Sequence, residues 1–192
     1  MSTQQSGVAA GSTRRSSASW RRWPAAVGLL GAAFVALGSP DRETLVISLL
    51  VALACYLAAA AFKVRWAAWA AIPIASALVT AGAFIGIDPW LMLGGASVVL
   101  IVVGVALRAA RTALAAQSLA LVAYGGVVLV ALTLGPVVGA VLASLVLIAH
   151  AAWDVIHYRR NAVVPRSLAE ACIFFDVPFG VAVIVLVFTG LS

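Results

Sequence analysis

Five ionisable side chains lie inside sequence that is otherwise apolar enough to reside in lipid. His150, Asp154 and His157 fall near the end of one apolar stretch, and Glu170 and Asp176 fall near the start of the next. Charged groups inside bilayer-spanning helices are costly, so they usually face a bundle interior or a cavity and mark functional sites. We therefore take these five residues as the candidate catalytic residues. Asp154 and Asp176 are the expected proton donor or acceptor, and His150 is expected to position one of them.

The spacing of these residues predicts how they are arranged. His150, Asp154 and His157 occur at i, i+4 and i+7, which places them on one face of a helix. A short connection to the next stretch predicts an antiparallel neighbour, in which His150 lies at the depth of Asp176, and Asp154 and His157 lie near Glu170. Glu170 is about 120° from Asp176 around the helix axis, which points it toward a different neighbour.

Three kinds of chemistry fit this set, and the sequence leaves them open. The first is acid/base catalysis, because a carboxyl group in apolar surroundings keeps its proton to higher pH and can donate it near neutral pH. Such a site suits isomerisation, cyclisation or hydration of a lipid or isoprenoid that enters from the bilayer. The second is a metal-dependent hydrolase, because histidines and carboxylates are ligands for zinc or iron. No HExxH or paired ExxH motif is present, so no metal ligand is assigned and the cofactor stays unknown. The third is a non-catalytic protein with hydrogen-bonded packing pairs, or one that moves protons; contact with interfacial water alone also explains His157 and Glu170.

Composition places these residues in a membrane protein. Of the 192 residues, 65% are hydrophobic and 9% are charged, whereas a soluble domain has about 45–50% and about 25%. The net charge of +6 comes from basic residues near helix ends, which membrane topology explains better than a nucleic-acid partner does. The polar composition of residues 1–19 predicts a disordered cytoplasmic tail, and residues 20–192 are expected to form one transmembrane domain.

The expected fold is an all-α bundle of seven transmembrane helices, each about 17–25 residues long. Asp88-Pro89 and Gly135-Pro136 are predicted to end one helix and begin the next, since proline suits the first helical turn. The first stretch also resembles a signal peptide, but the next span follows it at once, which favours a retained helix. The seven predicted spans are 23–39, 44–62, 66–87, 90–107, 112–134, 137–158 and 167–190.

The basic residues also predict the orientation of the bundle. With seven spans, all of them except Arg42 fall before the first span or in the second, fourth and sixth connections, which lie on one side. The positive-inside rule then puts the N-terminus in the cytoplasm and the C-terminus outside a bacterial-type inner (plasma) membrane. The residues on the cytoplasmic side are Arg14, Arg15, Arg21, Arg22, Lys63, Arg65, Arg108, Arg111, Arg159, Arg160 and Arg166.

Two resemblances bear on function. The pattern from His150 through Trp153 and Asp154 to His157, followed by Cys172 and Asp176, resembles a group of small, mostly uncharacterised bacterial multi-pass proteins over about the last forty residues. This resemblance implies no established activity. In size, helix count and intramembrane acids, the chain is loosely similar to the seven-helix membrane-bound terpene cyclases. That similarity implies a carboxylic acid that protonates an alkene or epoxide, with an isoprenoid as the ligand.

Overall fold

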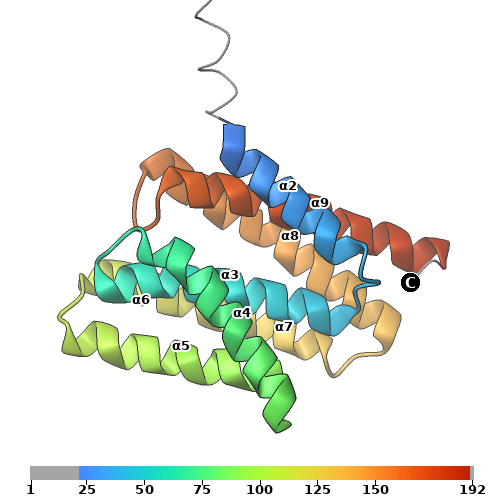
Figure 1. Cartoon of the computed structure of the whole chain (residues 1–192), viewed down its shortest axis with the longest axis horizontal. Coiled ribbons are helices and arrows are strands. Elements are labelled where there is room, and N and C mark those ends of the chain that lie inside the picture. The colour runs from blue at the N-terminus through green and yellow to red at the C-terminus, as the bar shows by residue number, and fades with distance from the viewer. Residues whose placement is uncertain (1–21, 191–192) are drawn as a thin grey trace, which may run out of the picture.

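The computed structural model describes residues 22–190, and over this range it is all-α, with helices joined by short turns (Figure 1). The predicted tail 1–19 lies outside the described residues. Helices α6, η2 and α7 follow one another without a break, and η2 is a single π-helical turn. The elements are α2 (Trp23–Ala36), α3 (Arg42–Phe62), α4 (Ala67–Ile85), α5 (Pro89–Ala106), α6 (Arg111–Ala120), η2 (Leu121–Gly125), α7 (Gly126–Ala131), α8 (Pro136–Arg160) and α9 (Arg166–Thr189).

Most of the predicted helix boundaries agree with those in the structure. Pro89 and Pro136 each occupy the first residue of a helix, as the sequence indicates. Asp41 caps the start of α3, where its side chain accepts a hydrogen bond from the backbone N–H of Thr44 at 2.9 Å. Such a cap satisfies one of the unpaired N–H groups at the beginning of a helix.

Six of the seven expected spans are long and apolar enough to cross a membrane: α3, α4, α5, the continuous run α6–α7, α8 and α9. The exception is α2, which has 14 residues and therefore reaches about 21 Å, less than the bilayer core of about 30 Å. It ends at Ala36 rather than at residue 39, because the chain turns there and Ser39 adopts a φ of 52°. The structure thus provides six helices of spanning length and one shorter apolar helix.

Helix α3 forms the centre of the bundle. It packs against α4, α5, the α6–α7 run and α8 (Figure 1), and its side chains are buried along most of its length. Its second half is rich in alanine, whose small side chains let neighbouring helices approach closely. The one large polar side chain in this buried part is Tyr56, which is 1% exposed.

Helices α2, α8 and α9 pack together on one side of α3 (Figure 1). Small residues set their separation. A Cβ atom added at Gly28 of α2 would lie 2.2 Å from the carbonyl oxygen of Ala171 on α9. A Cβ added at Gly180 of α9 would lie 2.9 Å from the carbonyl oxygen of Ser144 on α8. Both glycines therefore permit a helix contact that a side chain would prevent.

Loops from three parts of the chain meet at one end of the bundle, which we call the basic end. There Lys63 donates a hydrogen bond to the carbonyl of Leu107 at 2.9 Å. Arg65 donates to the carbonyl of Val164 at 2.6 Å and to Oδ1 of Asn161 at 2.5 Å. The connections that follow α3, α5 and α8 are therefore held side by side, as expected for loops on the same side of a membrane.

Candidate functional site

The imidazole of His150 lies between two carboxylates. Its Nδ1 is 2.8 Å from Oδ2 of Asp176 and 3.4 Å from Oδ2 of Asp154. None of the three residues is more than 1% exposed. His150 and Asp154 are one turn apart on α8, and Asp176 faces them from the antiparallel α9, at the depth that the sequence predicts for it. We call these three residues the acid cluster.

Tyr56 of α3 is hydrogen-bonded to the acid cluster, and the sequence analysis did not identify it. Its hydroxyl donates a hydrogen bond of 2.6 Å to Oδ1 of Asp154, so Oδ2 of the same carboxylate is left to face His150. Counting residues from the ends of the helices at the basic end could have identified Tyr56, because it lies at the same depth as Asp154. Tyr56 lies six residues before Phe62, the last residue of α3, and Asp154 lies six residues before Arg160, the last residue of α8.

Within residues 22–190, the only group beside the two carboxylates that can carry a positive charge is His150, when its imidazole is protonated. Neither lysine nor arginine forms an ion pair with Asp154 or Asp176 there, and Oδ2 of Asp154 and Nε2 of His150 have no hydrogen-bond partner. Two carboxylates at this spacing cannot both stay ionised in an apolar interior without a neighbouring positive charge. The geometry therefore calls for bound positive charge, either as protons or as a metal cation.

Asp176 also lines an apolar pocket of about 490 Å³ between α2, α3, α4 and α9. Among the described residues that line this pocket it is the only carboxylate, and Cys55 of α3 and Cys172 of α9 also line the pocket. The hydroxyls of Ser48 and Ser76 there already donate to carbonyls of their own helices. The pocket wall is therefore mainly apolar, and it includes two cysteines and the buried Asp176.

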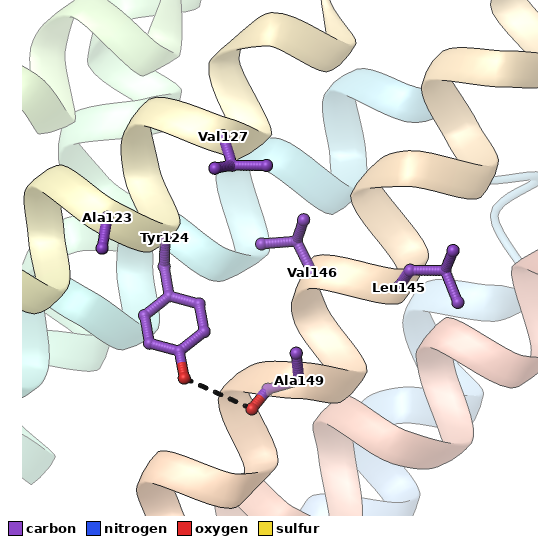
Figure 2. Close-up of a pocket in the computed structure, with 6 residues that line it drawn as sticks. All are labelled: Ala123, Tyr124, Val127, Leu145, Val146 and Ala149. Carbon is purple, nitrogen blue, oxygen red and sulfur yellow. Dashed lines mark hydrogen bonds between the residues drawn. The ribbon is translucent and has the colours of Figure 1, made fainter.

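A second, smaller pocket of about 300 Å³ lies between η2–α7 and α8 (Figure 2). Tyr124 lines it, and its hydroxyl points to the carbonyl of Ala149 at 3.5 Å. The rings of Tyr124 and His150 meet edge to face, with centroids 5.4 Å apart. The π-helical turn that carries Tyr124 is a local irregularity of a kind frequent at functional sites, and nothing in the sequence had indicated it.

His157 belongs to a separate hydrogen-bond network. Its Nδ1 donates to the carbonyl of Trp153 at 2.9 Å, and its Nε2 accepts from the side-chain amide of Gln117 at 3.1 Å. Trp153 Nε1 in turn donates to Oε1 of Gln117 at 3.2 Å. Every polar atom of this triad is paired, which fits a neutral imidazole that fixes the packing of α6 against α8. The ring of His157 also lies 4.8 Å from that of Tyr56, centroid to centroid.

Glu170 does not join the acid cluster. It is partly exposed on α9, and within residues 22–190 it makes no side-chain hydrogen bond or ion pair. This position agrees with the predicted rotation of Glu170 away from Asp176 around the helix axis. Of the five candidate residues, the structure thus brings together His150, Asp154 and Asp176. His157 lies beside Tyr56 but outside these hydrogen bonds, and Glu170 makes no contact of this kind.

No protein-family model, curated protein or solved structure matches this chain. The resemblances of the sequence to small bacterial multi-pass proteins and to terpene cyclases therefore stay predictions.

Proposed function

We propose that this chain is an intramembrane enzyme that performs acid/base chemistry on a lipid or isoprenoid. One observation carries the proposal: Asp176 is the only carboxylate lining a large apolar pocket, and it is hydrogen-bonded at 2.8 Å to a buried histidine. A pocket of this volume falls within the range of about 300–1,000 Å³ that small-molecule sites occupy. Its apolar lining favours a hydrocarbon ligand, and its place among spanning helices favours one dissolved in the bilayer.

The three members of the acid cluster would divide the chemistry between them. Asp176 is the only carboxylate among the described residues that line the pocket, so we assign to it the proton that a substrate double bond or epoxide oxygen receives, or that a substrate carbon gives up. Its side chain is 1% exposed, so side chains of the pocket wall must shift for a substrate to reach it. Nδ1 of His150 lies within reach of both carboxylates. A proton that Asp176 gives up can therefore be replaced from Nδ1, and Nδ1 can be reprotonated by Asp154. In an isomerisation, the substrate gains one proton and then loses one from another carbon. The released proton returns to the same groups, so no net proton is gained or lost.

We also propose that α2 is a seventh crossing, with the N-terminus in the cytoplasm and the C-terminus outside. The hydrogen bonds of Lys63 and Arg65 at the basic end support this orientation, because positively charged loops favour the cytoplasmic side. Arg42 lies at the other end of α3, where it contacts the carbonyl of Leu134. Reporter enzymes fused to the N-terminus and after Ser192 should be active on opposite sides of the membrane, because seven crossings place the two ends on different sides and six place them on the same side. Activity of both fusions on the same side would contradict seven crossings.

The lipid profile of an expressing host tests the enzymatic proposal. We expect wild-type protein to convert one lipid or isoprenoid into a product, and Asp176→Asn to abolish the conversion, because the amide cannot exchange the proton. Glu170→Gln is the matched control, since it removes a carboxylate from the same helix outside the acid cluster. Untargeted mass spectrometry of membrane lipids would measure substrate and product. A folded Asp176→Asn protein that gives the wild-type profile would contradict the proposal.

A further inference from the structure

We propose that His150, Asp154 and Asp176 bind one divalent transition-metal ion. Each residue offers one ligand atom, and these atoms all lie within 4.8 Å of one another. Nδ1 of His150 lies 2.8 and 3.4 Å from the two Oδ2 atoms. A tetrahedral zinc ion with ligands at about 2.0–2.2 Å separates them from one another by about 3.3–3.5 Å. One of the two distances already has this value, and the other needs to widen by about half an ångström. The two carboxylate oxygens lie within 4.8 Å of each other and must also take this separation.

A divalent ion would balance the charge of the acid cluster. Two carboxylates and a neutral imidazole carry two negative charges, which one divalent cation neutralises. Oδ2 of Asp154 is buried and has no hydrogen-bond partner although it faces Nδ1 of His150. A buried carboxylate oxygen without a donor is costly, and a cation between these groups would satisfy it.

The types of ligand indicate which ion binds. One imidazole nitrogen with two carboxylate oxygens suits zinc, iron or manganese, whereas calcium and magnesium prefer oxygen ligands only. Three protein ligands leave a coordination position open, as in catalytic rather than structural zinc sites. Because Asp176 is also part of the pocket wall, the ion would lie at the pocket's inner side.

Tyr56 would orient one of the ligands. Its hydroxyl holds Oδ1 of Asp154 at 2.6 Å, which leaves Oδ2 for the ion. Hydrogen bonds of this kind to metal ligands typically change the affinity by about 10–100-fold. The cation site stands on the geometry of the acid cluster, and only its chemical role rests on the proposed function. With the ion bound, a metal-bound water would replace a carboxyl group as the proton carrier of the site.

The experiment uses the full chain purified in detergent, stripped with a chelator, incubated with Zn²⁺ and freed of excess ion before elemental analysis. We expect about one equivalent of zinc in wild type and in Glu170→Gln, and loss of the zinc in His150→Ala, Asp154→Asn and Asp176→Asn. Tyr56→Phe should bind zinc about 10–100-fold more weakly in a titration. Thermal melting would be measured with and without Zn²⁺. A stabilising shift in wild type that is absent from Asp176→Asn supports the site independently of the purification.

Two results would overturn the cation site. One is folded wild-type protein that retains no ion after incubation with Zn²⁺, Mn²⁺ or Fe²⁺. The other is full retention by Asp154→Asn and by Asp176→Asn. Failure here is distinguishable from failure of the enzymatic proposal. A metal-free wild type whose lipid product is still lost in Asp176→Asn overturns only the cation, whereas a metal-binding wild type that leaves the lipid profile unchanged overturns only the acid/base enzyme.

Discussion

Replacing His150 with alanine is expected to lower the free energy of unfolding by about 3–5 kcal/mol, the range seen when one partner of a buried charged group is removed. The substitution leaves Asp154 and Asp176 in the interior without the ring that separates them, and it also opens a cavity where a fully buried side chain stood. Reversible unfolding in mixed micelles would measure the loss. A chelator in all samples ensures that no bound cation contributes to the difference.

The unfolding measurement on His150→Ala needs a control variant and a double variant. Glu170→Gln should change stability by no more than about 0.5 kcal/mol, because Glu170 is partly exposed and lies outside the acid cluster. Adding Asp176→Asn to His150→Ala should restore part of the lost stability, since one of the two facing carboxylates becomes neutral. Such non-additivity is expected of residues in contact. If His150→Ala costs less than about 1 kcal/mol, the three side chains are not coupled as described.

Gly28→Ala should be the most damaging single-methyl substitution on α2. The new Cβ would lie 2.2 Å from the carbonyl oxygen of Ala171 and 3.0 Å from its carbonyl carbon. Both atoms are backbone and cannot rotate away, so α2 must separate from α9. Overpacking of this kind costs about 1–3 kcal/mol and occasionally more. The same unfolding measurement applies, and reaction of Cys172 with an apolar thiol reagent should become faster, because α2 forms one wall of the pocket that this cysteine lines.

Gly95→Ala is the matched control for Gly28→Ala. Gly95 lies inside α5, and a Cβ added there has open space around it. Alanine is the better helix former by about 0.8–1.0 kcal/mol, so this variant should be as stable as wild type or more stable. Equal stability of the two variants would show that the close approach of α2 and α9 is not a constraint.

Much of the fold could be predicted because membrane helices are recognisable from their length, their apolar composition and the residues at their ends. Proline at positions 89 and 136 marked two helix starts, and the short connection after α8 was enough to place His150 opposite Asp176. These are local features. Each depends on residues close together in the chain or on two helices joined by one loop.

The contacts that the sequence did not reveal are long-range or depend on small changes in backbone geometry. Tyr56 and Asp154 are 98 residues apart in the chain, and an isolated tyrosine in an apolar stretch carries no signal of its partner. Gln117 was overlooked for the same reason. The early end of α2 and the π-helical turn at Leu121–Gly125 were also not indicated by the sequence. His157 was a candidate because it shares a helix face with His150 and Asp154, and Glu170 because it is an acid near the start of the next span. Neither feature determines which side chains form hydrogen bonds with one another.

Deuterium transfer is the most direct test that Asp176 exchanges a proton with an apolar substrate. The lipid that accumulates in hosts expressing Asp176→Asn rather than wild type would be incubated with each purified protein in D₂O. We expect wild-type protein to place deuterium on carbon in the product, and Glu170→Gln to do the same, whereas Asp176→Asn should place none. A wild-type product that forms without carbon-bound deuterium would contradict acid/base chemistry at this site.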